Sequence, residues 1–227
     1  MQSASRLLSN RLNKACLLCQ QNSTDLICQY CMESIHLFDQ QQCAGNLMSL
    51  PYIKAGLPDC QFSTLRAIGP YRWPMSDLLA GLKFNNQLIS AKVIAALFVS
   101  KALRTDDLLP DCIVPVPLGP GRYTRRKYNQ SIEIARYIGM HLAIPVQDNL
   151  IRRVTDTMPQ TELSAAQRKH NLHNAFELLQ PLLARRIVIF DDVVTTGATT
   201  QNLYALINAQ YPHLDIEVWA ACVTPRR

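Results

Sequence analysis

Two adjacent carboxylates and a turn of small, hydroxyl-bearing residues form the part of the sequence best suited to chemistry. Asp191 and Asp192 are followed by residues 195–200, four threonines around one Gly-Ala pair. Before a helix, such a turn directs backbone N–H groups and the positive end of the helix dipole at one point, which favours a phosphate. The acids repel that phosphate and suit hydroxyl groups, or a metal ion that neutralises them. The pattern describes a ribose 5-phosphate site; a plain strand–turn–helix junction with threonine caps is the alternative.

An apolar strand must position these groups. Residues 187–190 form a continuous apolar run, which predicts a parallel strand buried on both faces, and an apolar helical pattern follows at residues 203–207. Ligands of open α/β sheets bind at the carboxyl ends of the strands, so the acids and the turn are expected at that edge. The segment resembles the phosphoribosyl-pyrophosphate (PRPP) loop of type I phosphoribosyltransferases, and it lacks the Gly-Lys-Ser/Thr of a Walker loop. The resemblance implies catalytic roles for Asp191 and Asp192, and a PRPP-binding set of Asp191, Asp192, Val193, Val194, Thr195, Thr196, Gly197, Ala198 and Thr199.

A second strand and a basic segment precede this motif. Residues 112–117 read as a short apolar strand that ends in Pro-Leu-Gly-Pro-Gly, and a helix is predicted from about Ser131 to Leu142. In a phosphoribosyltransferase the loop after the first core strand receives pyrophosphate through backbone N–H groups, although a rigid turn is the alternative. Arginine grips phosphate oxygens with two donors, so the basic run that follows favours pyrophosphate or nucleic acid over a plain surface patch. The predicted residues are Val116, Leu118, Arg125, Arg126, Lys127, Asn129 and Gln130.

The chain also contains two CxxC pairs near its beginning. Cys16 with Cys19, and Cys28 with Cys31, would together supply four thiolates to one tetrahedral metal site, most simply a structural zinc. An iron–sulfur cluster and a set of buried free thiols are the alternatives. Cys43 and Cys60 lie outside the pairs and are interpreted as buried thiols, or as a replacement for one ligand. No pattern suggests their pairing as a disulfide.

The rest of the sequence predicts an α/β fold. Strands alternate with helices up to a last strand at residues 216–222, which predicts a parallel sheet flanked by helices after a small Cys₄ zinc-finger domain. The expected boundaries are 1–62 for the zinc-finger domain and 63–227 for the α/β domain. Residues 155–162 are interpreted as a mobile loop and residues 163–176 as a helix capped by Ser164. Lys83 lies beside the apolar face of a predicted helix that includes Phe84. It is interpreted as a solvated or snorkelling lysine, and contact with a ligand phosphate is the less favoured alternative.

Composition limits the classes of partner and the compartment. The 227 residues are 48% hydrophobic and carry a formal net charge of +6, a mild excess that favours phosphates or nucleic acid. The polar, basic first residues show no signal peptide, and no apolar run approaches transmembrane length. We therefore expect a cytoplasmic protein without membrane insertion, in which the clustered cysteines are reduced.

Taken together, the motifs resemble the ComF/GntX family of competence and amidophosphoribosyltransferase-like proteins. The shared segments are the CxxC pairs and residues 81–84, 114–118, 126–130, 157–160 and 191–199, together with Arg168, Asn171 and residues 174–176. The family pattern usually has Arg-Gly-Phe-Asn-Gln at residues 126–130, where this chain has Lys127 in place of the glycine. Members often carry a second pair of CxxC knuckles, of which only Cys43 and Cys60 remain here.

The resemblance implies a type I phosphoribosyltransferase-like fold that binds PRPP with Mg²⁺ and carries a zinc finger. It also implies a cytosolic factor that handles incoming single-stranded DNA during natural transformation, with a helicase-like partner. Two alternatives stay open. One is an active phosphoribosyltransferase that moves the ribosyl phosphate to a base or amine, and the other is a zinc-finger adaptor with a vestigial ligand pocket.

Overall fold

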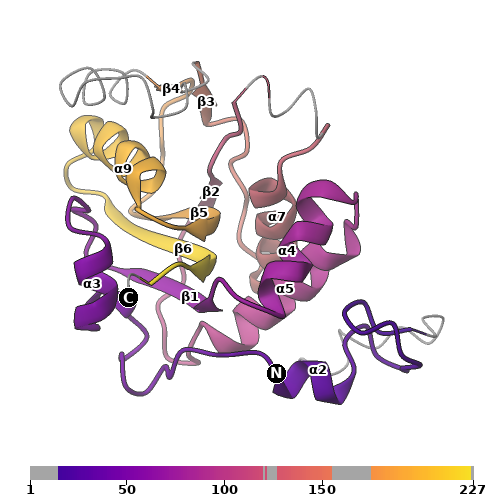
Figure 1. Cartoon of the computed structure of the whole chain (residues 1–227). Coiled ribbons are helices and arrows are strands. Elements are labelled where there is room, and N and C mark those ends of the chain that lie inside the picture. The colour runs from indigo at the N-terminus through magenta and orange to yellow at the C-terminus, as the bar shows by residue number, and fades with distance from the viewer. Residues whose placement is uncertain (1–14, 120, 122–126, 155–174, 226–227) are drawn as a thin grey trace, which may run out of the picture.

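A parallel β-sheet forms the centre of the protein (Figure 1). The computed structural model describes residues 15–119, 121, 127–154 and 175–225. Within them the sheet has four parallel strands in the order β1-β6-β5-β2. Their bounds are β1 Leu65–Pro70, β2 Cys112–Pro115, β5 Arg186–Val194 and β6 Asp215–Val223. The predicted α/β class with a parallel sheet is confirmed.

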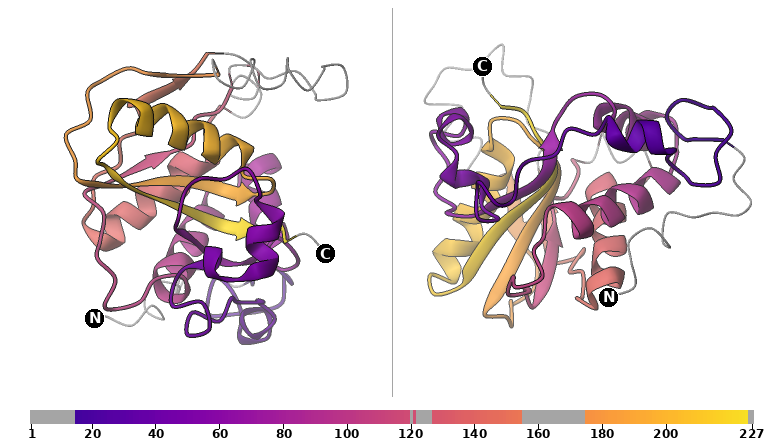
Figure 2. Two further views of the ribbon diagram at one scale, coloured as in Figure 1. Left: turned by 90° about the vertical axis from the view of Figure 1, so that its left-hand side faces the viewer. Right: turned by 90° about the horizontal axis from the view of Figure 1, so that it is seen from below.

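Helices cover both faces of this sheet, as Figures 1 and 2 show. The helices α4, α5 and α7 lie on one face, and α9 and the short α3 and η1 lie on the other. Alternate residues of β5 serve the two layers: Val188 and Phe190 pack toward the first, whereas Ile187 and Ile189 pack toward the second. The bounds are η1 Leu47–Ser49, α3 Pro51–Gly56, α4 Met75–Phe84, α5 Ile89–Lys101, α7 Gln130–Leu142 and α9 Ala198–Gln210.

The N-terminal segment packs across one edge of the sheet. The N–H of Phe38 donates to the carbonyl of Ile68 in β1 at 3.0 Å. Gly69 fits because it has no side chain: a Cβ there would lie 1.9 Å from the carbonyl oxygen of His36. The segment that follows the cysteine pairs therefore covers the edge strand, which would otherwise present unpaired backbone groups. A short helix near the cysteines, α2, spans Gln29–Glu33.

Two short antiparallel strands lie outside the main sheet and were not predicted. They are β3, Ile151–Arg153, and β4, Phe176–Leu178. The predicted helix over residues 163–176 is wrong at its end, because Phe176 belongs to β4, where its ring is buried beneath the Arg153 guanidinium at 5.4 Å. The rest of that predicted helix with its Ser164 cap, Arg168, Asn171 and Asn174, and the predicted loop at residues 155–162, lie outside the described residues.

The strand that carries the acids is longer than its apolar run. β5 continues through Asp191 and Asp192 to Val194, because β6 runs alongside it and pairs Asp191 with Ala220 and Val194 with Val223. The acids therefore stand within the last part of the strand rather than after it. Phe84, predicted on the apolar face of its helix, is 72% exposed. In the described ranges, none of the helices combines the length and apolar character needed to cross a membrane.

Candidate functional site

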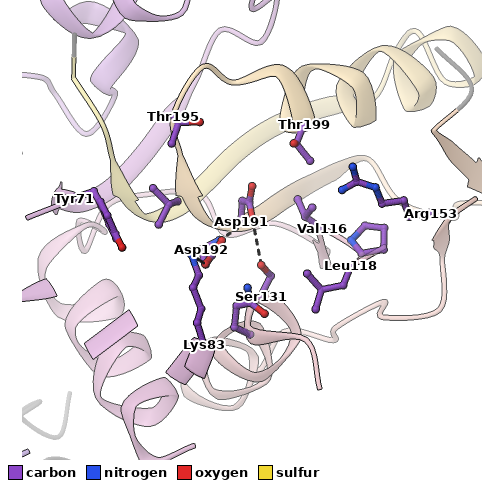
Figure 3. Close-up of a pocket in the computed structure, with 13 residues that line it drawn as sticks. Tyr71, Lys83, Val116, Leu118, Ser131, Arg153, Asp191, Asp192, Thr195 and Thr199 are labelled. Atoms are coloured by element: carbon purple, nitrogen blue, oxygen red, sulfur yellow. Dashed lines mark hydrogen bonds and ion pairs between the residues drawn. The ribbon is translucent and has the colours of Figure 1, made fainter. Parts of the chain in front are cut away.

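A cavity of about 340 Å³ opens where β5 and β2 end. Figure 3 shows how side chains from several separate elements converge on it. It is lined from the segment after β1, the end of α4, the turn after β2, the start of α7, β3, β5 and the turn that follows β5. The lining residues are Tyr71, Lys83, Val116, Pro117, Leu118, Gln130, Ser131, Arg153, Asp191, Asp192, Val193, Thr195 and Thr199.

The two carboxylates are held by different partners. Oδ1 of Asp191 accepts a hydrogen bond from the Ser131 hydroxyl at 3.2 Å and another from the N–H of Asp192 at 2.8 Å. Oδ2 of Asp192 forms an ion pair with Nζ of Lys83. Burial, with the negative charge of Asp192 beside it, raises the pKa of Asp191 to about 8, although Lys83 acts in the opposite direction. One lysine therefore does not supply enough positive charge to keep both carboxylates ionised.

The interpretation of Lys83 as a solvated side chain is wrong. Its side chain is only 17% exposed, and that of Asp192 is 11% exposed. The reason is tertiary: the last turn of α4 ends next to the carboxyl end of β5, so the lysine extends over the acids (Figure 3). This contact joins residues far apart in the chain, and no local pattern in the sequence indicates it.

The turn after β5 forms a small hollow beside the acids. Residues 193–200 and Asp191 line a second cavity of about 30 Å³. Gly197 has φ = 72°, a left-handed conformation that glycine adopts without strain, and α9 begins at the next residue. Among the described residues, the backbone N–H groups of Thr195, Thr196 and Gly197 donate to no protein atom. These groups and the start of α9 are thus available to an anion.

The turn after β2 meets the start of α7 through Asn129. Its side-chain oxygen accepts from the N–H of Ser131 at 2.9 Å and caps the helix, while Nδ2 donates to the carbonyl of Val116 at 2.8 Å. Asn129 is therefore occupied by the protein rather than directed at a ligand. The prediction that the N–H of Val116 donates to a ligand is wrong. This N–H donates to the carbonyl of Phe190 at 2.9 Å and so continues the pairing with β5. Its side chain still lines the cavity.

Gln130 is the polar group at this wall that still needs a partner. Its side chain is buried, it lines the cavity, and within the described part of the chain its Oε1 has no hydrogen-bond partner. Buried polar atoms are nearly always paired in native proteins, so this amide is well placed to meet a bound molecule.

The structure brings most of the predicted site residues to one place. Asp191, Asp192, Val193, Thr195, Thr199, Val116, Leu118 and Gln130 line the larger cavity, and Val194, Thr196, Gly197 and Ala198 line the smaller one. Arg125 and Arg126 lie outside the described residues, and Lys127 is exposed and does not line either cavity. The residues that sequence reasoning did not assign are Tyr71, Lys83, Pro117, Ser131 and Arg153.

The four paired cysteines come together as predicted. The Sγ atoms of Cys16, Cys19, Cys28 and Cys31 all lie within 4.8 Å of one another, and those of Cys19 and Cys28 are 3.7 Å apart. Zinc bound by four sulfurs at about 2.3 Å requires sulfur–sulfur distances of about 3.8 Å, so this donor set can hold a structural zinc ion.

Backbone N–H groups support the same interpretation. Burial acts to raise the pKa of Cys16, but hydrogen bonds from the N–H groups of Cys28, Cys19 and Leu18 outweigh it and lower the pKa to about 6. Burial raises the pKa of Cys31, and the pKa of Cys19 is raised as well, so a bound cation would be needed to keep all four cysteines as thiolates. Thiolates, not thiols, ligate zinc. Cys43 and Cys60 lie outside the cluster: Cys43 is buried in the other core layer, and Cys60 packs against the turn at Gly197. The interpretation of these two as thiols that do not replace a ligand fits the structure.

Comparison with known proteins identifies the family to which the chain belongs. No family model matches the chain. It is 33% identical to Competence protein F of Haemophilus influenzae, over 93% of this chain and 98% of that protein. The chain belongs to the ComF family. Over 70% of its length it is 37% identical to DNA utilization protein YhgH of Escherichia coli, covering 72% of that protein, and over 84% it is 23% identical to Competence protein ComFC of Streptococcus pneumoniae, covering 85%.

Lys127 occupies a backbone conformation that explains the glycine usual in the ComF pattern. Its φ is 62°, in the left-handed region where a Cβ is strained. The next residues, Tyr128 and Asn129, are fixed by contacts with Leu82 and Val116, so the chain has to turn sharply just before them. This chain therefore keeps the left-handed conformation at position 127, although a lysine stands there in place of the glycine.

Lys127→Gly should therefore stabilise the protein by about 1 kcal/mol, because glycine adopts positive φ without strain. Lys127→Ala removes the same charge and chain but keeps the Cβ, and it should bring no such gain. Urea unfolding of the three proteins measures the difference. Equal stability of the glycine and alanine variants would contradict the conformational explanation.

Metal removal should expose the role of the cysteine cluster. Purified protein is expected to contain about one zinc per chain, and a chelator should lower the melting temperature because the ion holds together a segment with little core of its own. Cys31→Ser should do the same, whereas Cys43→Ser, outside the cluster, should leave the zinc content unchanged. Full folding and unchanged melting in the metal-free protein would refute a structural zinc.

Proposed function

We propose that this chain binds PRPP, or a closely related sugar phosphate, together with Mg²⁺, and that it handles single-stranded DNA during DNA uptake. The observation that carries the first part is the convergence of an anion-binding turn and a carboxylate pair on one cavity at the carboxyl edge of a parallel sheet. Its volume is in the range of small-molecule sites. A type I phosphoribosyltransferase-like fold accounts for the same arrangement.

The turn after β5 would receive the 5-phosphate. The N–H groups of Thr195, Thr196 and Gly197, which have no acceptor within the described ranges, and the positive end of α9 favour an anion there. Hydroxyls from the neighbouring threonines add further donors. This hollow is small, which suits one phosphate group rather than a base or a ring.

The carboxylates would face the ribose hydroxyl groups and the metal. The raised pKa of Asp191 reflects its burial first and the negative charge of Asp192 second, and a divalent cation would offset both. Mg²⁺ takes oxygen ligands and usually binds through one or two carboxylates plus substrate phosphates, so the donor set fits. When bound, the ion would neutralise charge on the pyrophosphate group. Ser131 orients Asp191, and Leu118 and Gln130 would form the opposite wall.

The DNA part of the proposal draws on the relatives and on charge. Of the three relatives described above, two are named for competence and one for DNA utilization. The chain has a net charge of +6, and in the sequence Arg125, Arg126 and Lys127 come between the turn after β2 and the start of α7. Positive charge of this kind binds nucleic-acid backbones. We propose a cytoplasmic location and a helicase-like partner on the same basis.

Calorimetric titration with PRPP in the presence of Mg²⁺ tests the site. Wild-type protein should bind, and Asp191→Asn with Asp192→Asn should weaken binding at least tenfold, because the metal and the ribose hydroxyls lose their acceptors. Asp215→Asn, which removes a carboxylate at the opposite end of the sheet, serves as the matched control. Equal affinity in the wild type and the double variant would remove the site assignment. Absent binding to a folded wild type would favour an adaptor.

DNA binding should show the signature of phosphate contacts. Affinity for a single-stranded oligonucleotide is expected to fall steeply with salt, and Arg126→Ala or Lys127→Ala should reduce the slope of log affinity against log salt by about one contact each. Lys101→Ala, an exposed lysine at the end of α5, is the control and should have little effect. Fluorescence anisotropy at several salt concentrations measures the slopes. A salt-independent interaction would contradict the proposal.

A further inference from the structure

Lys83 lines the cavity and pairs with one of the acids, a contact that neither the sequence motifs nor the family resemblance assigns. It projects from the last turn of α4, and its ammonium group pairs with Oδ2 of Asp192. The same cavity is lined on its other side by Leu118 and Gln130, the wall expected to face pyrophosphate. Figure 3 shows the lysine extending from the end of α4 toward Asp192, with Leu118 beyond Ser131 on the other side of the cavity.

The backbone that carries Lys83 is tied to the turn after β2. The hydroxyl of Tyr128 donates to the carbonyl of Leu82, the residue before the lysine. The residue after Tyr128 is Asn129, whose amide donates to the carbonyl of Val116. The end of α4, the start of α7 and the turn after β2 therefore form one connected unit. The base of the Lys83 side chain is fixed, while its flexible four-carbon stem lets the ammonium group change partners within the cavity that it lines.

Charge makes the present partner of Lys83 exchangeable. An ammonium group and a divalent cation that approach the same carboxylate repel each other, so Lys83 and a metal ion compete for Asp192. A diphosphate offers the ammonium group a new set of anionic oxygens at hydrogen-bond range. Because Lys83 is largely buried, leaving Asp192 without any replacement would be costly. The exchange is therefore favourable only when metal and diphosphate arrive together.

We infer that Lys83 is an exchangeable counter-ion: it neutralises Asp192 in the free protein, and it moves to a diphosphate oxygen when a metal–diphosphate ligand fills the cavity. The ligand class rests on the proposed function. The role has two consequences that act in opposite directions. Lys83 hinders the binding of a free divalent cation, and it strengthens the binding of a diphosphate.

Two titrations of the full chain measure these consequences. Mn²⁺ binding, followed by electron paramagnetic resonance, should become roughly tenfold tighter in Lys83→Met, since the competing charge is removed. Inorganic pyrophosphate with Mg²⁺, followed by calorimetry, should bind roughly tenfold to a hundredfold more weakly to the same variant, since a charge-assisted hydrogen bond is lost. Lys101→Met, also in the last turn of a helix, should change neither affinity.

A double variant guards against a folding defect. Lys83→Met leaves Asp192 without its cation, whereas Lys83→Met with Asp192→Asn removes both charges and leaves no unpaired buried ion. The double variant should lose the gain in Mn²⁺ affinity and keep the loss in pyrophosphate affinity. Pyrophosphate affinity restored to the wild-type level in the double variant would show that Lys83 makes no ligand contact, and would overturn the inference.

The two titrations separate this inference from the proposed function. If wild-type protein binds PRPP but Mn²⁺ affinity is equal with and without Lys83, the counter-ion role fails and the sugar-phosphate site stands. If Mn²⁺ affinity rises in Lys83→Met and pyrophosphate binds more weakly while PRPP itself does not bind the wild type, the counter-ion role stands and the choice of sugar phosphate fails.

Discussion

The position of β5 between two parallel neighbours is the constraint on which the site depends. The strand pairs with β6 on one edge and β2 on the other, and its side chains are buried on both faces. Phe190, directly before the acids, packs at its edge against Phe98, whose ring is also 5.1 Å from that of Trp219. Since neither face nor edge allows the strand to shift by one residue, Asp191 and Asp192 are held at a fixed height at the carboxyl end of the sheet.

From that fixed point, the other parts of the site are positioned by elements that pack on the same layers. α4 and α7 lie on one face and bring Lys83 and Ser131 to the acids, while α9 begins at the turn that continues β5. Two negative carboxylates, one ammonium group and backbone amides that favour an anion therefore lie close together in one small space. The acids are offset by Lys83, Ser131 and a backbone N–H, whereas among the described residues the amides of the turn and the Gln130 oxygen have no partner.

The parts of the structure that could be predicted are those encoded by local pattern. The apolar run before Asp191 predicted a buried strand, the helix predicted from about Ser131 begins at Gln130, and the spacing of the first four cysteines predicted a cluster. Each of these signals lies within a short stretch of chain, where residue period and spacing are informative.

The parts that could not be predicted depend on contacts between distant segments. Lys83 and Asp192 are over a hundred positions apart, and their pairing follows from the packing of α4 on the sheet. β3 and β4 are three residues each, too short for a period of two to stand out. The N–H of Val116 was expected to face a ligand, yet it pairs with the carbonyl of Phe190 in the neighbouring strand, just after β2 ends at Pro115.

The contact between Cys60 and the turn at Gly197 has an evolutionary consequence. A Cβ on Gly197 would lie 2.3 Å from the sulfur of Cys60 and 3.1 Å from a methyl carbon of Leu57. Any larger residue at position 197 would thus need smaller ones in the segment around 57–60, and the two places must vary together. Related sequences with a different residue at one of these places are expected to carry a compensating replacement at the other. The segment around residues 57–60 and the turn after β5 should therefore evolve together.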